Sequence, residues 1–230
     1  MSLWDVVREL FQPPMNPEYL PSDLSFKGQS VLVTGTSGGL GLEAAIHYVN
    51  HDANPVHITV RNAARGAEIQ RIIEERTGKK GILRVWVLDM DTFAGVQKFM
   101  EEWKQDVKEI DIVLLNAGIQ LFAYQESPDG WEMDLQVNTL GTTLLGLLML
   151  QWMRSVKKPE QAQHLGFVGS GSHFDLVDIA SPTFPKEDAL NFFNQKQNYP
   201  SGRPQYGTSK LFQQYAVLEI AKLAHDSEGR

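Results

Sequence analysis

Thr34-Gly35-Thr36-Ser37-Gly38-Gly39-Leu40-Gly41 follows a short apolar run, Val31 to Thr34, and leads directly into sequence with helical periodicity. Glycines let the backbone turn tightly and approach a pyrophosphate, while the free N–H groups and dipole of a new helix attract an anion. A flexible glycine turn is the alternative interpretation. The position of the loop between a strand and a helix favours a dinucleotide site, and the residues expected to contact the cofactor are Gly35, Ser37, Gly39, Leu40 and Gly41.

Outward from this loop, short β-branched or leucine-rich runs alternate with longer segments of helical period. Apolar strands separated by helices predict a parallel sheet covered on both faces, a doubly wound α/β (Rossmann) fold. The expected strands are Val31–Thr34, Val56–Val60, Ile82–Leu88, Asp111–Asn116 and Leu165–Gly169, and the expected helices are Gly41–Asn50, Ala63–Thr77, Thr92–Val107, Trp131–Ser155 and Gln205–Ala224.

The N-terminal residues differ in character from the rest of the chain. Five apolar residues recur at helical spacing before four prolines, so we expect a short amphipathic helix and a stiff linker over residues 1–27. Residues 28–230 then form one nucleotide-binding domain. The helix is expected to dock on its own domain, with weak membrane binding as the alternative; its apolar residues are Leu3, Val6, Val7, Leu10 and Phe11.

Composition excludes several classes of protein. The 230 residues include 28 acidic and 21 basic side chains, which give a net charge of −7 and leave no broad basic face for nucleic acid. The absence of cysteine excludes disulfides and thiolate metal sites, and with no glycosylation sequon we expect a cytoplasmic protein. The most apolar stretch, Leu140 to Met153, is shorter than the ~20 residues of a membrane span, so it predicts a buried helix.

The second expected strand indicates which dinucleotide would bind. Where an acidic side chain would grip the ribose 2′-hydroxyl of NAD, the chain has Arg61, with Arg65 close behind. A guanidinium suits a 2′-phosphate, so this position favours NADP. A solvated arginine on a loop is the alternative.

The loop spacing TGxxxGxG resembles that of the short-chain dehydrogenase/reductase family, and other family landmarks follow in order over residues 28–226. RNAARG, residues 61–66, and the long interval before Tyr206 resemble the retinol-dehydrogenase-like branch, which includes fungal biosynthetic reductases. The resemblance implies an adenine contact, an NAG motif in which Leu115 replaces the family's first Asn, and a catalytic set. These positions are Asp89 for adenine, Asn116 and Gly118 of NAG, and the catalytic residues Asn138, Ser170, Tyr206 and Lys210.

The YxxxK pattern suits hydride transfer to a carbonyl, because the oxygen then needs a proton. A tyrosine with a pKa near 10 is a suitable acid, and a nearby cation that stabilises tyrosinate makes both directions accessible. Residues four apart share one face of a helix, so Tyr206 and Lys210 project into the same cleft. Ser170 would hydrogen-bond the substrate oxygen. By resemblance, Tyr206 and Lys210 also contact the cofactor, and Asn138 positions a water.

These features lead to an NADP-dependent oxidoreductase acting on a small-molecule ketone or secondary alcohol, with no metal. The resemblance also implies a homo-oligomer built through the two long helices. The chain ends after the catalytic helix, so we expect family strands six and seven to be missing and the fifth strand to form an edge. A truncated, inactive nucleotide-binding homologue is therefore the alternative. A nucleotide-sugar epimerase is a third reading, against which the glycine spacing argues.

Weaker signals have ordinary explanations beside the functional ones. His47 and His51 are four apart on a helix, but no third metal ligand is evident, so surface histidines are expected. The stretch His173–Pro204 is too long for an ordinary connection and suggests a lid or a substrate-shaping insert. Within it, His173 could line the cleft or make a loop hydrogen bond. The aromatic residues Phe192, Phe193 and Tyr199 could form an apolar substrate wall or pin the loop to the core.

Overall fold

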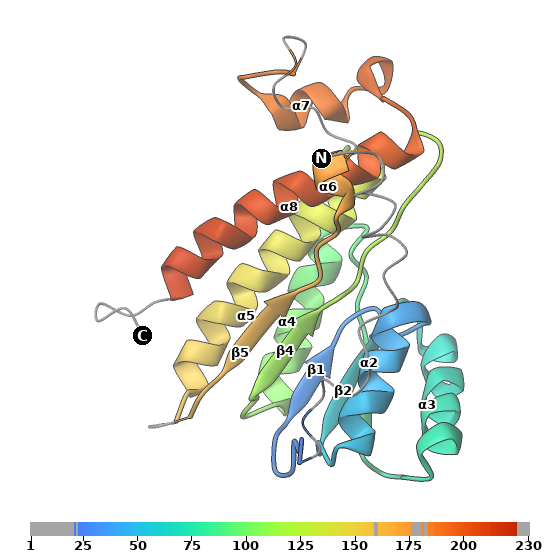
Figure 1. Cartoon of the computed structure of the whole chain (residues 1–230), viewed down its shortest axis with the longest axis vertical. Coiled ribbons are helices and arrows are strands. Elements are labelled where there is room, and N and C mark those ends of the chain that lie inside the picture. The colour runs from blue at the N-terminus through green and yellow to red at the C-terminus, as the bar shows by residue number, and fades with distance from the viewer. Residues whose placement is uncertain (1–20, 22, 159–160, 176–180, 182–183, 225–230) are drawn as a thin grey trace.

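A computed structural model describes residues 21, 23–158, 161–175, 181 and 184–224 of the chain. The described residues form one five-stranded parallel sheet, ordered β3-β2-β1-β4-β5, with helices on both faces (Figure 1), which confirms the predicted doubly wound fold. The strands are β1 (Val31–Val33), β2 (Val56–Val60), β3 (Leu83–Val87), β4 (Ile112–Leu115) and β5 (His164–Phe167). The expected N-terminal helix lies outside the described residues.

The helices begin and end close to their predicted bounds in the first half of the chain and differ from them in the second. In the first half lie α2 (Gly39–Asn50), α3 (Ala63–Thr77) and α4 (Phe93–Asp106). The second half contains η2 (Leu135–Gly141), α5 (Thr142–Val156), α6 (Ser172–Asp175), α7 (Ala189–Asn194), η3 (Lys196–Asn198) and α8 (Gly202–Ala224).

The alternating side chains of the central strands build a core on each face of the sheet. Val31 and Val33 of β1 point into a cluster with α2 and α3, and Leu32 between them points into a cluster with α4 and α5. All three side chains are completely buried. Burial on both faces explains why the strands read as continuous apolar runs rather than as alternating ones.

Side-chain caps explain where α3 and α4 begin. The side chain of Asn62 accepts the N–H of Arg65, and that of Thr92 accepts the N–H of Gly95, so each satisfies an amide that has no partner within its helix. Helix α3 ends at Gly78, whose φ of 68° is left-handed and favours glycine. Both helices were predicted from their periodicity, and these caps explain their observed ends.

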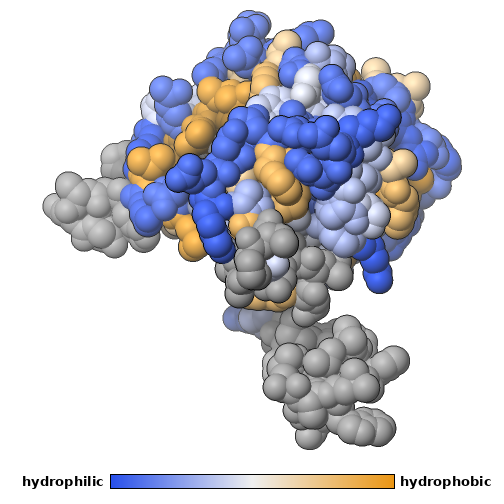
Figure 2. Space-filling view, turned by 90° about the horizontal axis from the view of Figure 1, so that it is seen from above, coloured by the Kyte–Doolittle hydropathy of each residue, from blue (hydrophilic) through white to orange (hydrophobic). Residues whose placement is uncertain are grey.

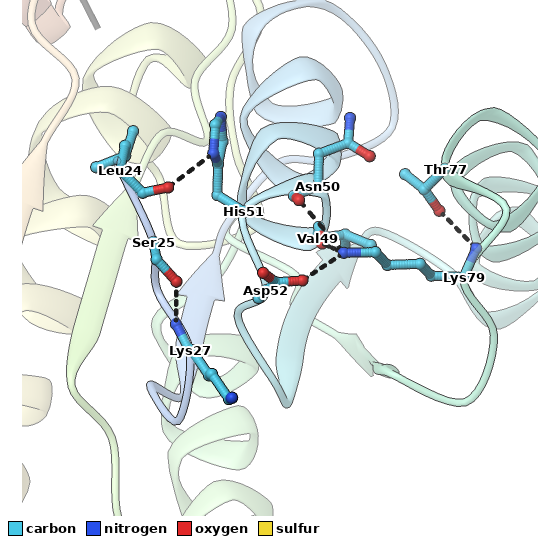
Figure 3. Close-up of polar contacts among 9 residues, drawn as sticks. All are labelled: Leu24, Ser25, Lys27, Val49, Asn50, His51, Asp52, Thr77 and Lys79. Atoms are coloured by element: carbon cyan, nitrogen blue, oxygen red, sulfur yellow. Dashed lines mark hydrogen bonds and ion pairs between the residues drawn. The ribbon is translucent and has the colours of Figure 1, made fainter. Parts of the chain in front are cut away.

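A lysine fastens the C-terminal end of α2 to the segment that follows α3 (Figure 3). The Lys79 ammonium donates to the carbonyl oxygens of Val49 and Asn50, at 2.9 and 3.3 Å, and to the Asp52 carboxylate at 2.7 Å. A cation at this end of a helix satisfies free carbonyls and interacts favourably with the dipole. The pKa of the Asp52 carboxyl is lowered by its hydrogen bond from Lys79.

The second half departs from expectation in three places. The single helix expected over Trp131–Ser155 includes the π-helical turn η2 before α5, and the YxxxK helix begins at Gly202 rather than Gln205. The stretch His173–Pro204 contains the short helices α6, α7 and η3 rather than only loop. In the described part of the chain, no helix combines the length and hydrophobicity needed to cross a membrane.

Candidate functional site

The glycine loop is shaped by close backbone approaches that exclude any side chain. Gly35 has a φ of 71°, and a Cβ there would lie 2.7 Å from the Cα of Ala117, beyond the end of β4. At Gly41 a Cβ would lie 2.4 Å from the Gly35 carbonyl oxygen. Only glycine fits at these two positions, so the loop folds tightly against the carboxyl ends of β1 and β4.

Asn116 joins the end of β4 to the same loop. Its side-chain amide donates to the carbonyl oxygen of Thr34 at 2.9 Å and to that of Gly35 at 3.3 Å. Its backbone N–H donates to the Thr34 hydroxyl at 3.0 Å. In this structure Asn116 therefore supports the loop, one layer behind the surface that would face a ligand.

Thr59 is a second support for the loop, and the sequence did not single it out. Its hydroxyl accepts the N–H of Gly35 at 3.1 Å, and its carbonyl oxygen accepts the Thr36 hydroxyl at 3.0 Å. A threonine inside an apolar strand is an ordinary β-branched residue in the sequence. Only the adjacency of β1 and β2 reveals this contact.

The N-terminus of α2 is open. No side chain caps it, and no acidic residue occupies its first turn. Leu40, in this turn, is 73% exposed. Uncapped amides at a helix N-terminus form an anion-binding end, and here they lie beside the glycine loop.

Next to the loop lies a cleft of about 280 Å³ at the carboxyl ends of the strands. Four predicted residues line it: Gly35, Ser37, Arg61 and Gly118. Its other walls were not predicted; they come from Thr59, Val60, Leu88, Met90, Asp91, Ala117 and Val137. In doubly wound folds, ligands bind in the crevice at this end of the sheet.

Two arginines stand at the rim of this cleft. The Arg61 side chain is 62% exposed and lies 3.9 Å from the Asp91 carboxylate. Arg65 donates to the Ser37 carbonyl oxygen at 2.9 Å and pairs with Glu68 at 2.5 Å. Arg65 is thus bound to the glycine loop, and Arg61 lines the same cleft as Gly35 and Ser37.

Asp89, expected to contact an adenine ring, makes a turn after β3. Its carboxylate accepts the N–H of Asp91 at 2.9 Å, and Gly95 packs so closely that a Cβ there would lie 2.3 Å from the Asp89 carbonyl oxygen. The cleft is lined by the residues on either side, Leu88 and Met90, rather than by Asp89 itself.

Asn138 lies completely buried inside η2. Its side-chain N–H groups donate to the Ile119 carbonyl oxygen at 2.7 Å and to the Ser209 hydroxyl at 2.9 Å, and its oxygen accepts the N–H of Ile119 at 2.8 Å. π-Helical turns are rare and are often found at functional sites. Here the turn places Asn138 between the loop after β4 and helix α8.

The side chains of Lys210 and Asn138 both lie against Gly118. A Cβ at Gly118 would lie 3.0 Å from the Asn138 side-chain oxygen and 3.4 Å from the Lys210 Nζ. The Lys210 ammonium donates to the Val168 carbonyl oxygen at 3.1 Å and to the Gln213 side-chain oxygen at 2.9 Å. Burial lowers the pKa of Lys210 to about 8, because desolvation penalises the charged form.

Tyr206 and Lys210 share one face of α8, as their spacing predicted. The Lys210 Nζ lies 5.9 Å from the centre of the Tyr206 ring. Tyr206 is half-buried, and its hydroxyl has no hydrogen-bond partner among the described residues. The phenol is therefore available to a ligand.

Ser170 follows β5 and leads into α6. Its hydroxyl accepts the N–H of Ser172 at 3.2 Å, and its carbonyl oxygen forms a hydrogen bond with the His173 Nδ1. Lys210 contacts Val168, two residues before Ser170, and α6 packs against α8. These contacts place Ser170 on the side of α8 that bears Lys210. The His173 ring makes the loop hydrogen bond that was one of its two predicted roles.

The residues with weaker sequence signals make packing contacts in the structure. Phe193 is buried among Phe184, Phe192 and Phe212, and Tyr199 packs edge-on against Tyr124, so these aromatics pin the insert to the domain. The rings of His47 and His51 stack at 6.2 Å. Among the described residues there is no group of three or more side chains able to hold a metal.

A profile of the short chain dehydrogenase family matches residues 29–162. Short-chain dehydrogenase/reductase ffsI of Aspergillus flavipes is 32% identical over 94% of this chain and 62% of its own length. A short chain dehydrogenase of Alternaria solani is 31% identical over 89% of this chain and 70% of its own. The chain spans about three fifths of the length of the first of these fungal relatives.

Solved structures share the fold. A short chain dehydrogenase of Escherichia coli in complex with NADPH is 22% identical and has a TM-score of 0.63, with 88% of this chain and 74% of that chain covered. The RhlG/NADP active-site complex of Pseudomonas aeruginosa is 21% identical, also with a TM-score of 0.63, and the match covers 87% and 68%.

Proposed function

This chain belongs to the short-chain dehydrogenase/reductase family, and from that premise we propose that it is an NADP-dependent oxidoreductase acting on a ketone or secondary alcohol. The observation that carries the proposal is that Asn138 and Lys210 both lie against Gly118, which lines the cleft beside the glycine loop. A dinucleotide cleft and a buried lysine next to a free phenol are the two parts that such a reaction requires.

The cleft fits a dinucleotide at its phosphate end. The open N-terminus of α2 would receive the pyrophosphate, and a Cβ at Gly41 would push into the Gly35 carbonyl that shapes the loop. The residues that would hold the cofactor are those predicted: Gly35, Ser37, Gly39, Leu40, Gly41 and Gly118, with Asp89 and Asn116 supporting the walls. When bound, the nicotinamide supplies the hydride.

Arg61 and Arg65 favour a cofactor with a 2′-phosphate. Both lie near the glycine loop, and the Arg65 guanidinium already contacts the Ser37 carbonyl oxygen. A guanidinium pairs strongly with phosphate, because its hydrogen bonds are charge-assisted. NADP bound to two solved structures of the same fold supports this choice.

Tyr206 is the proposed proton donor to the substrate oxygen. Its hydroxyl is free, and the Lys210 ammonium lies near the ring. Each pKa unit by which a cation favours tyrosinate corresponds to ~1.4 kcal/mol. Since the pKa of Lys210 is about 8, its ammonium form predominates at neutral pH and can supply that positive charge.

Ser170 and Asn138 complete the proposed set. The Ser170 hydroxyl would donate to the substrate oxygen as charge develops on it. The Asn138 side chain, held by Ile119 and Ser209, keeps the loop after β4 against α8 and so fixes the position of Lys210 relative to the cleft.

Helices α5 and α8 support a homo-oligomer. A groove on them is lined by leucines together with three polar residues: Leu147, Leu148, Leu150, Leu223, Gln151, Arg154 and Ser155. Tyr215 and Leu218 of α8 are also about half exposed. Figure 2, viewed from the side of α7, shows several hydrophobic patches between hydrophilic residues rather than one continuous apolar face. Light scattering after size exclusion tests this part of the proposal: twice the mass of the chain supports it, and the mass of a monomer contradicts it.

The decisive experiment for the enzymatic proposal measures binding and turnover on the same protein. We expect tighter binding of NADPH than NADH by calorimetry, and NADPH oxidation with at least one member of a broad panel of ketones. NADPH binding without oxidation of any panel member would leave a nucleotide-binding protein and contradict the enzymatic proposal. Failure to bind either dinucleotide would contradict both parts.

A further inference from the structure

Glu132 is a completely buried carboxylate that the proposed catalytic set does not use. It stands one residue before the helical turn that leads into η2. Its Oε1 accepts the N–H of Asp134 and its Oε2 accepts the N–H of Leu135, both at 3.1 Å. An acidic group at a helix N-terminus interacts favourably with the helix dipole and satisfies free amides. Glu132 thus caps the helix that carries Asn138.

The same carboxylate reaches across to α8. Its Oε2 accepts the side-chain N–H of Gln205 at 2.6 Å, and Gln205 is also completely buried. This bond is charge-assisted and therefore stronger than one between neutral groups. Gln205 is the residue immediately before Tyr206.

A second contact fixes α8 one turn later. Ser209 accepts the Asn138 side-chain N–H on its hydroxyl at 2.9 Å and the Thr139 hydroxyl on its carbonyl oxygen at 2.8 Å. Gln205 and Ser209 are four residues apart, so they lie on one face of the helix. Tyr206 lies between these two contacts along the helix axis.

The contact at Gln205 matters most because α8 begins only three residues earlier, at Gly202. Helix ends fray, since their first amides lack partners within the helix. Two other hydrogen bonds of Gln205 oppose this fraying. Its backbone N–H donates to the Ser201 carbonyl oxygen, and its side-chain N–H donates to the Phe193 carbonyl oxygen. The Glu132 bond is the shortest of the three.

The insert before α8 meets the same carboxylate residue. The Asn194 side chain accepts the backbone N–H of Glu132 at 2.6 Å and donates to the Gly130 carbonyl oxygen at 3.1 Å. The Tyr124 hydroxyl donates to the Asn194 carbonyl oxygen at 3.1 Å. Glu132 is therefore the point where the loop after β4, the insert and the first turn of α8 are joined.

We propose that Glu132 and Gln205 are positioning residues, whose hydrogen bond fixes the first turn of α8 and so holds the Tyr206 phenol at the cleft. The proposal rests on the proposed function for the role of Tyr206. Neither residue touches the reacting atoms; both act through the helix that carries the phenol.

A carboxamide at position 205 is essential to this arrangement because it donates to a carboxylate. Gln205→Glu places a second carboxylate against the Glu132 Oε2, and the other ionisable groups facing this pair are Tyr124, Asp134 and Tyr199. Two carboxyl groups at hydrogen-bond distance can share one proton but do not both ionise without strong repulsion. The variant should therefore keep the contact at low pH and lose it at high pH.

The test compares Gln205→Glu with wild type and with Gln97→Glu, which adds the same charge on the exposed face of α4. For Gln205→Glu at pH 8 we expect kcat about tenfold or more below wild type, since misplacing a catalytic group by about 1 Å can cost on the order of 100-fold. The loss should shrink at pH 6. The affinity for NADPH should stay within about threefold, because the cleft at the glycine loop is untouched. Gln97→Glu should match wild type.

Hydrogen–deuterium exchange at pH 8 gives a readout that does not depend on turnover. The amides within residues 203–207, where Pro204 has none, should exchange faster in Gln205→Glu than in wild type, while those of α4 stay unchanged. If wild type reduces no carbonyl, the proposed function fails and this exchange result still decides whether the pair fixes the helix. If Gln205→Glu does not fold, Glu132→Gln, which keeps the side-chain size, is measured by the same exchange and by kcat at pH 8, without the comparison between pH values.

The proposal is overturned by unchanged exchange at residues 203–207 in the folded variant. A kcat within twofold of wild type at pH 8 overturns it too. An equal loss at pH 6 and pH 8 would indicate a general defect of the fold rather than a lost contact, and would likewise contradict it.

Discussion

The nucleotide side and the catalytic side of this site are built by different means. Around the glycine loop, backbone approaches backbone: Gly35 against Ala117, and Gly41 against the Gly35 carbonyl. Around η2 and α8, buried polar side chains bind one another, as Asn138 binds Ser209 and Glu132 binds Gln205. At Gly35 and Gly41 the first region excludes an added Cβ, whereas the second depends on matched donors and acceptors.

This difference decides how each region responds to mutation. A Cβ added at Gly35 or Gly41 should remove dinucleotide binding and turnover together. A side chain altered at α8 should reduce turnover while binding persists, because α8 contributes little to the cleft that the loop lines. The two regions can therefore be separated by measuring both quantities on each variant.

Tyr206→Phe is the strongest test of the separation. Loss of the phenolic proton should lower kcat by about 100-fold or more, the range expected for a general acid, with NADPH affinity within a few fold of wild type. Steady-state kinetics and calorimetry on the same sample provide the two values. Activity comparable to wild type would remove Tyr206 from its proposed role.

Gly41→Val is the counterpart on the nucleotide side. Its Cβ would lie 2.4 Å from both the Gly35 carbonyl oxygen and the Asn116 side-chain nitrogen, so the loop must move. We expect NADPH affinity to fall by about 100-fold, equivalent to ~2.7 kcal/mol. Gly166→Ala is the control, since a Cβ there meets its nearest atom at an ordinary 3.5 Å. Equal affinities for the two variants would show that the loop does not hold the cofactor.

Arg61→Ala should affect only one kind of cofactor. Removing a guanidinium that pairs with a 2′-phosphate should weaken NADPH by about tenfold and leave NADH unchanged. Arg71→Ala, which removes an exposed partner of Glu75 on α3, serves as the control. Equal losses for NADPH and NADH would mean that no 2′-phosphate lies near Arg61.

Asp134→Asn tests the buried polar groups of the catalytic side through the pH dependence of the unfolding free energy. Burial, reinforced by Glu132, raises the pKa of Asp134 to about 7. The unfolded chain ionises this group near pH 4, whereas the folded protein keeps it protonated, so its contribution to stability is present at low pH and is lost as pH rises toward 7. Relative to wild type, Asp134→Asn should gain at least about 1.4 kcal/mol between pH 4 and 8, the equivalent of one pKa unit.

Chemical unfolding at several pH values measures this change. The Asp106→Asn variant, which removes one exposed carboxylate from α4, provides a matched control for the loss of a charge. A constant difference between Asp134→Asn and wild type across the range would contradict the assignment of a buried, protonated carboxyl.

Lys79→Met should have the smallest effect, a modest loss of stability, and no effect on function. It removes the ammonium that caps α2 at the end away from the cleft (Figure 3), so we expect a loss of about 1 kcal/mol in unfolding free energy. NADPH affinity should not change. A loss of affinity would mean that the two ends of α2 are coupled.

The same contrast explains what could be predicted from the sequence. The glycine loop and the strand–helix alternation are local patterns, so the fold and the residues of the loop followed from spacing alone. The ligand contacts of Asn116 and Asp89 stay predictions; their hydrogen bonds within the loop and the turn after β3 were not predicted, because the sequence shows no direction for a side chain.

The catalytic side was harder because its contacts join distant parts of the chain. Glu132 and Gln205 lie 73 residues apart, and Asn138 and Ser209 lie 71 apart, with no motif linking either pair. The π-helical turn at η2 was predicted as ordinary helix, since its residues have the same apolar pattern. The start of α8 was placed late because Gly202 and Pro204 are weak helix formers.

The most direct measurement of the central claim follows the hydride itself. NADPH carrying deuterium at the transferred position of the nicotinamide is incubated with the protein and a ketone that it reduces, and the alcohol is analysed by mass spectrometry. The account predicts alcohol with deuterium on the carbinol carbon from wild type, and about 100-fold or more less of that alcohol in the same time from Tyr206→Phe. Unlabelled alcohol from wild type, or equal amounts of labelled alcohol from both proteins, would contradict it.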